Sequence, residues 1–127
     1  MNVLLLCSAI LVLLYAVLSL NVSRVRLKKR KDPDITEAVL TETVRAHGNA
    51  GEYVPVFVAA FLYLSSTPTG VAVSTIAVVA TASRIAHAAG MLRAASVNQR
   101  NALRYYGALG TYISLFAVAA VLFQRLL

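Results

Sequence analysis

The sequence predicts an all-α integral membrane protein, a four-helix transmembrane bundle that forms a single domain over residues 1–127. The first observation is composition, because 59% of the residues are hydrophobic and the mean hydropathy is +0.73. Soluble domains are roughly 45–50% apolar. The second is that the apolar residues form four long segments separated by short polar connections. The third is charge, because six of the 12 basic residues directly follow the first apolar segment.

The first predicted span covers residues 3–20, which are almost entirely apolar. About 18 such residues can cross a hydrocarbon core of roughly 30 Å. No basic residue precedes this segment and the positive charges come after it, so we interpret it as a retained anchor rather than a cleaved signal peptide. The one cysteine, Cys7, lies inside it and is expected to behave as a small hydrophobic residue, because no intrachain disulfide is possible.

The segment 24–34 is predicted to be a cytoplasmic basic loop that connects the first two spans. A run of arginines and lysines next to an apolar span is typical of a juxtamembrane topology signal, which is favoured here over a nucleic-acid site. Asp34, followed three residues later by Glu37, resembles the start of the next helix, with a capping side chain and a carboxylate in the first turn.

The second helix is expected from about residue 35 to residue 64, with its membrane span at 45–64. A helix of about 30 residues is roughly 45 Å long, so its first turns should stand outside the hydrocarbon core. The purely apolar part, Val54–Leu64, is too short to span alone. The polar stretch Arg45–Glu52 must therefore complete the span, and other helices should shield it from lipid.

The third and fourth spans are predicted at 71–92 and 104–123. The third is rich in alanine and valine and carries Arg84 and His87 one turn apart, and the fourth opens on Arg104. Arg84 is expected to have a structural use, either pairing with Glu52 or reaching towards the headgroups. His87 on its own reads most simply as a packed histidine, because two histidines without a cysteine or carboxylate at ligand spacing predict no metal site.

The distribution of basic residues predicts the topology. The connection after the first span and the connection between the third and fourth spans are both basic, whereas the turn at 65–70 has no charge. Basic loops stay on the cytoplasmic side, so both termini are expected outside. The polar residues near these loops, contributed by all four helices, then converge on the cytoplasmic half of the bundle.

A candidate binding face lies at the start of the second span. At about 100° per residue, Asn49 lies roughly 40° from Arg45, and Glu52 lies roughly 20° away on the other side. Arg45 could bind a ligand carboxylate, Glu52 a ligand ammonium, and Asn49 could both donate and accept hydrogen bonds. A purely structural polar network is the alternative. His47 points away from this face.

Arg104 is the candidate for chemistry. At the start of a helix, its guanidinium would add to the positive end of the helix dipole. Such a site could hold a thiolate and lower the pKa of a bound thiol from about 8.5 towards neutrality. The alternative is that Arg104 is only a positive-inside anchor. The sequence contains no pattern of a protein nucleophile with its base, so chemistry would come from activating a bound thiol.

Three motifs in this order resemble the MAPEG superfamily, the membrane-associated proteins of eicosanoid and glutathione metabolism. The resemblance covers nearly the whole chain and includes the basic Val25-Arg26-Leu27-Lys28-Lys29. The motifs are Arg45-Ala46-His47-x-Asn49-x-x-Glu52-Tyr53-x-Pro55, Ser83-Arg84-Ile85-Ala86-His87 with Gly90-Met91, and Arg104-x-x-Gly107-x-x-x-Thr111-Tyr112. Gly48 and Met91 stand where many eukaryotic members have an arginine and an aromatic residue, so the chain is more similar to bacterial members.

The resemblance implies a homotrimer in a bacterial inner membrane, with glutathione bound between neighbouring protomers. It implies that the tripeptide is bound by Arg26, Arg45, Asn49, Glu52 and His87. Arg104 would stabilise the glutathione thiolate for attack on a small lipophilic electrophile, as in a glutathione transferase or a related peroxidase.

Two other functions stay open at this point. One is a non-catalytic membrane protein that binds a lipid or a small anion, or a small transporter that uses the carboxylate of Glu52. The other is haem binding by His47 and His87, for which we expect no Soret band.

Overall fold

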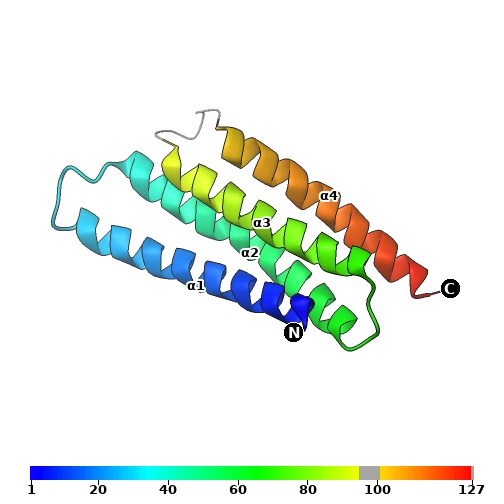
Figure 1. The fold of residues 1–127 in the computed structure, drawn as a ribbon. Coiled ribbons are helices and arrows are strands. Elements are labelled where there is room, and N and C mark those ends of the chain that lie inside the picture. Colours follow the sequence, from blue (N-terminus) through cyan, green and yellow to red (C-terminus); the bar gives the residue numbers. More distant parts are fainter. Residues whose placement is uncertain (95–100, 127) are drawn as a thin grey trace.

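The structure is a computed structural model that describes residues 1–94 and 101–126. It contains four helices, shown in Figure 1. They are α1 (Val3–Lys29), α2 (Glu37–Ser65), α3 (Val71–Arg93) and α4 (Ala102–Gln124). The all-α four-helix prediction is therefore confirmed. Arg100, part of the basic connection expected on the cytoplasmic side, lies outside the described residues.

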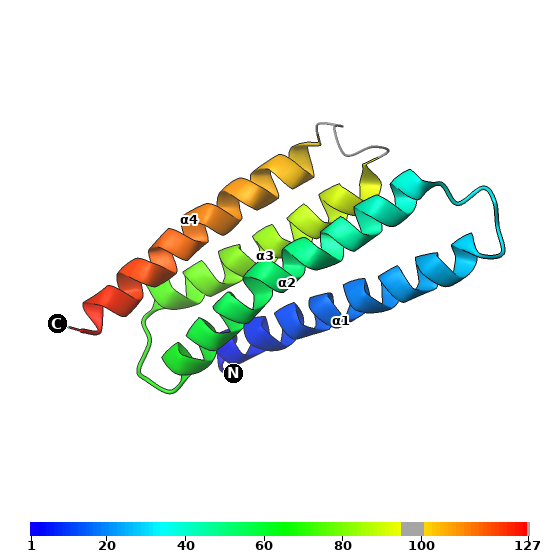
Figure 2. The same cartoon turned by 180° about the vertical axis from the view of Figure 1, so that it is seen from behind.

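The helices run up and down, so both termini lie at the end of the bundle that holds the α2–α3 turn (Figures 1 and 2). Two hydrogen bonds fasten the chain ends there. The side-chain amide of Asn2 donates to the carbonyl of Ser65 at 3.4 Å, and the Arg125 guanidinium donates to the carbonyl of Pro68 at 2.8 Å. The α1–α2 connection lies at the opposite end, where the basic residues gather.

Three of the helices, α1, α3 and α4, are long and apolar enough to cross a membrane. Large apolar side chains such as Leu13, Leu20 and Phe116 are exposed on their outer faces, as lipid-facing positions require. Helix α2 is the longest, with 29 residues, but it is not one of these three candidates. The charged stretch that begins at Arg45 lowers the hydropathy of α2. A membrane position for α2 therefore depends on its packing with the other helices rather than on its own hydropathy.

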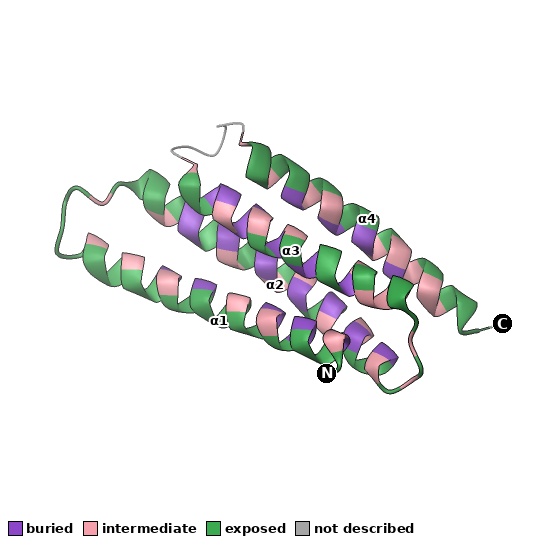
Figure 3. Ribbon diagram, viewed as in Figure 1, coloured by how far each residue is buried: buried purple, intermediate pink, exposed green. Residues whose placement is uncertain are grey.

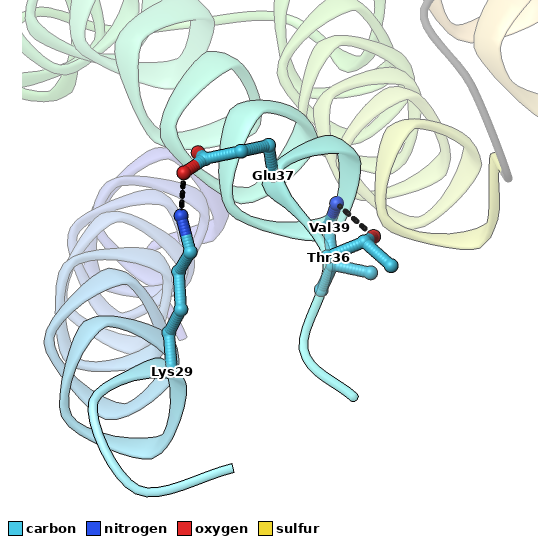
Figure 4. Close-up of polar contacts among 4 residues, drawn as sticks. All are labelled: Lys29, Thr36, Glu37 and Val39. Atoms are coloured by element: carbon cyan, nitrogen blue, oxygen red, sulfur yellow. Dashed lines mark hydrogen bonds and ion pairs between the residues drawn. The ribbon is translucent and has the colours of Figure 1, made fainter. Parts of the chain in front are cut away.

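The junction between α1 and α2 differs in detail from the prediction. Helix α1 continues through Lys29, so the first part of the segment expected as a loop over 24–34 is helical. The hydroxyl of Thr36, rather than Asp34, caps α2 by accepting from the backbone N–H of Val39 at 3.4 Å (Figure 4). Glu37 in the first turn of α2 forms an ion pair with Lys29, which joins the two helices across the connection.

The apolar core lies mainly among α1, α2 and α3, and Val118 of α4 joins it. Its largest side chains, Phe57 and Phe61 of α2, have ring centroids 5.6 Å apart and are almost completely buried. Cys7 and Leu11 of α1 pack into the same core, so Cys7 is the buried hydrophobic residue expected. Buried positions accordingly concentrate on the inner faces of the bundle, whereas the outer faces of α1 and α4 are exposed (Figure 3).

Helix α4 joins the bundle through α3, with which it packs closely over small residues. A Cβ at Gly107 would lie 2.5 Å from the backbone nitrogen of His87, and a Cβ at Gly90 would overlap the backbone of Arg104. Among the described residues, α4 makes extensive contact with α3 only. This one-sided attachment leaves an open space between α4 and α2.

Candidate functional site

A cleft of about 1290 Å³ occupies the space between α2 and α4, with α3 below it. Its polar lining lies towards the end of the bundle where the α1–α2 connection is. The lining residues come from three helices and the residue before α4: Val44, Arg45, Gly48, Asn49, Glu52, His87, Met91, Asn101, Ala102, Arg104, Tyr105, Tyr106, Ala108 and Tyr112.

The polar face predicted on α2 lines one wall of this cleft. Arg45, Asn49 and Glu52 all face it, because their spacing places them on successive turns of one helical stripe. Asn49 is half-buried, whereas Arg45 and Glu52 are exposed in the single protomer. We expected the other helices to shield these two charges from lipid. Within this chain they do not.

The other side of the cleft is built where α3 meets the start of α4. The carbonyl oxygen of Arg104 accepts a hydrogen bond from Nδ1 of His87 at 2.9 Å. Because a carbonyl can only accept, Nδ1 of His87 carries the proton, and Nε2 of the neutral ring is an acceptor. Asn101 caps α4 by accepting from the backbone N–H of Leu103 at 2.9 Å, which leaves Arg104 in the first turn.

Arg84 lies beneath the cleft as a buried cation with 1% of its surface exposed. Its guanidinium donates to Oδ1 of Asn49 at 2.6 Å and to the hydroxyl of Thr111 at 3.4 Å, and it lies 4.9 Å from the ring centroid of Tyr53. The expected pairing with Glu52 is wrong for the described residues, where no ion pair within 4.0 Å joins the two. Arg84 also does not reach the surface.

Two residues that the sequence analysis considered as possible ligand-binding residues lie away from the cleft. Arg26 is exposed on α1, which packs against α2 and α3 on the opposite side of the bundle from α4. His47 stacks on Tyr15 of α1, with ring centroids 4.8 Å apart, which agrees with its predicted position off the polar face. Of the six predicted site residues, the structure therefore brings five together: Arg45, Asn49, Glu52, His87 and Arg104.

Sequence reasoning missed two features of the site. The first is Asn101, which caps α4 and lines the cleft; an asparagine just before an apolar helical run is a recognised N-cap signal. The second feature is an aromatic edge of the cleft, formed by Tyr105, Tyr106 and Tyr112. No signal in the sequence predicts this, because it depends on how α4 is rotated against α3.

The arrangement suits a small ligand that carries both signs of charge. Arg45 and Arg104 provide cations on opposite walls, Glu52 provides a carboxylate, and Asn49 lies between them on the α2 side. The exposed tyrosines add apolar surface beside the polar groups. No group of three potential metal ligands occurs within residues 1–94 and 101–126.

The fold and cleft define a class: a helical membrane protein with a charged cleft at one end of its bundle. The chain matches the sequence model of the MAPEG family over residues 4–124, and it belongs to that family. No curated protein and no solved structure matches the chain.

Proposed function

We propose that this protein is a membrane-bound glutathione transferase or peroxidase-like enzyme. The family includes glutathione transferases and related proteins. The single observation that carries the proposal to this chain is the cleft, in which Arg45, Asn49, Glu52, His87 and Arg104 gather from three helices. Glutathione has two carboxylates, an ammonium group and a thiol, and the cleft offers a cation for a carboxylate, a carboxylate for the ammonium and a second cation for the thiolate.

Binding would use charge complementarity across the cleft. The guanidinium of Arg45 pairs with a glutathione carboxylate, and the carboxylate of Glu52 pairs with the glutathione ammonium. Asn49 adds an uncharged hydrogen-bonding group between them. His87, which donates from Nδ1 to the carbonyl of Arg104, offers Nε2 as a further acceptor.

Arg104 would stabilise the thiolate. Its guanidinium and the positive end of the α4 helix dipole both favour a negative charge at this position. The glutathione thiol gives its proton to water, and the thiolate sulfur then forms a bond to an electrophilic carbon. The leaving group departs with its electron pair, or, in an addition, a neighbouring atom takes a proton from water.

A homotrimer would complete the site. Arg45 and Glu52 are exposed in one protomer at the start of the predicted span of α2, where unshielded charge is costly. A neighbouring copy that covers the cleft would shield these charges. The same arrangement would let the exposed Arg26 of α1 reach a ligand held by another protomer.

Glutathione binding to the purified protein and to Arg45→Ala tests the proposal. Wild type should bind glutathione, and Arg45→Ala should weaken binding by roughly tenfold to a hundredfold, the usual effect of losing a charged hydrogen bond. Lys31→Ala is the matched control, because it also removes an exposed cation but lies outside the cleft. Wild-type protein that binds no glutathione would refute the proposal.

The second candidate is a protein that binds a lipid or small anion in the same cleft without chemistry. The open, tyrosine-lined edge of the cleft favours it, because such a surface suits an amphipathic ligand. Glutathione binding without conjugation of any generic electrophile, such as an aryl halide, would support this candidate over the enzyme.

A further inference from the structure

We propose that Arg84 is a positioning residue that fixes the side-chain amide of Asn49, so that the cleft presents its N–H donors and selects an oxygen acceptor on the ligand. The inference rests on the proposed function for the identity of the ligand, glutathione. Beyond the proposed function, the role of Arg84 determines which atoms of Asn49 contact the ligand.

The direction of the amide follows from the chemistry of arginine. A guanidinium has only donors, so the atom of Asn49 that lies 2.6 Å from Arg84 must be the oxygen. Asparagine is half-buried and lines the cleft at this position, and its nitrogen lies on the other branch of the amide from the oxygen. With Oδ1 turned towards Arg84, we infer that Nδ2 and its two hydrogens face the ligand.

Arg84 itself is held from several sides. The hydroxyl of Thr111 donates to the carbonyl of Gly107 at 2.7 Å, so its oxygen is free to accept from Arg84. The ring of Tyr53 lies against the guanidinium, and almost no surface of Arg84 is exposed. These contacts come from α2 and α4, so the guanidinium is fixed relative to both walls of the cleft.

A fixed amide changes what the cleft can recognise. A free asparagine can rotate its side chain to offer either an oxygen or a nitrogen, and so accepts both kinds of ligand group. Held by Arg84, Asn49 keeps its oxygen turned towards the guanidinium and offers its N–H groups to the cleft, while Glu52 on the same wall offers acceptors only. The α2 wall therefore distinguishes the acidic and the basic ends of a zwitterionic peptide, such as the γ-glutamyl group of glutathione.

Asn49→Asp tests this polarity directly. The carboxylate can still accept from Arg84, and the pair becomes charge-assisted, so the thermal stability without ligand should be unchanged or higher. The group that faces the cleft becomes an acceptor in place of a donor, so glutathione binding should weaken by at least tenfold. Gly48→Asp is the control, because it adds an acid to the same cleft and leaves the Asn49 amide intact. Its effect on binding should be several-fold smaller.

Arg84→Lys and Arg84→Met test the positioning role. Lysine retains a donor and should restore part of the glutathione affinity that methionine loses. Stability without ligand is measured for Asn49→Ala, Arg84→Met and the double variant. The two single effects should not add, because each change removes the same hydrogen bond. If Arg84→Met does not fold, the glutathione affinities of Arg84→Lys and Asn49→Asp still test the positioning role.

The outcomes separate this inference from the proposed function. Stability effects of Arg84 and Asn49 that simply add, or an Asn49→Asp variant that unfolds, would overturn the inference even if wild type binds glutathione. An Asn49→Asp variant that binds glutathione as tightly as wild type would also overturn it. Wild type that binds no glutathione would overturn the proposed function, while the stability cycle would still support or refute the Arg84–Asn49 coupling.

Discussion

Glu42 is a buried carboxylate with no hydrogen-bond partner among the described residues. Only 3% of its surface is exposed, and both carboxylate oxygens are unpaired. Burying an unpaired polar group costs about 1–3 kcal/mol, so Glu42→Met should stabilise the protein by an amount of that order. Thermal unfolding in detergent, followed by circular dichroism, measures the shift in Tm.

The control for this change is Glu37→Gln. Glu37 is exposed and pairs with Lys29 at the surface, so its replacement should alter stability by no more than about 1 kcal/mol. A lower Tm in Glu42→Met would show that the carboxylate has a stabilising partner in the assembled protein.

Replacing Arg104 should affect the conjugation rate more than glutathione binding. In Arg104→Ala the glutathione thiolate loses its guanidinium, so the conjugation rate should fall by about a hundredfold, as when one charge-stabilising donor is removed from an active site. Glutathione affinity should fall far less, because Arg45 and Glu52 still hold the peptide. Conjugation of an aryl halide followed by absorbance gives the rate, and equal losses of rate and affinity would contradict a role in catalysis.

At the residue scale, the sequence predicted which side chains share a helix but not which side chains meet between helices. The 3.6-residue period placed Arg45, Asn49 and Glu52 on one stripe, and all three line the cleft. Arg84 was expected either to pair with Glu52 or to reach towards the headgroups. It bonds to Asn49 instead, and this choice depends on the rotation of α3 against α2, which no local pattern encodes.

At the scale of elements, the α3–α4 pair is held by glycines that let two backbones approach closely. Gly107→Ala should destabilise the protein by about 1–3 kcal/mol, because a Cβ there would lie 2.5 Å from the backbone of His87. The same change should distort the cleft, since His87 supports the carbonyl of Arg104. Tm and glutathione affinity should therefore fall together.

Gly48→Ala on α2 is the matched control for Gly107→Ala. Nothing lies within 4 Å of a Cβ added at Gly48, and alanine favours a helix over glycine by up to about 1 kcal/mol. The Tm of Gly48→Ala should therefore be unchanged or slightly higher. If Gly48→Ala and Gly107→Ala lower the Tm equally, close packing of α3 on α4 is not what the glycine at 107 provides.

The elements themselves were largely predictable, because long apolar runs define α1, α3 and α4. The ends of the helices were less predictable. Helix α1 continues into the basic run because lysine and arginine are good helix formers and nothing breaks the chain before Lys29. The role of Gly90 was missed, since its close contact with Arg104 exists only once α3 and α4 are aligned.

At the scale of the whole molecule, the single protomer leaves its site exposed. Helix α4 packs mainly on α3, so Arg45 and Glu52 are exposed in a chain whose other three helices are apolar enough to cross a membrane. Charged side chains that face lipid at bilayer depth are costly unless a polar partner covers them. The physical demand for a cover, rather than any contact within the chain, favours the proposed trimer.

A trimer whose sites lie between protomers makes a prediction about mixtures. If Arg26 acts on glutathione held in a neighbour's cleft, Arg26→Ala and Arg45→Ala should each lose most activity as homotrimers. Assembled together in equal amounts from unfolded chains, they should recover about a quarter of the wild-type sites, because one neighbour can supply Arg26 and the other Arg45. If both arginines act within the same protomer, mixing recovers nothing. Conjugation rates of the two variants, measured before and after co-assembly and normalised to wild type treated in the same way, distinguish the two arrangements.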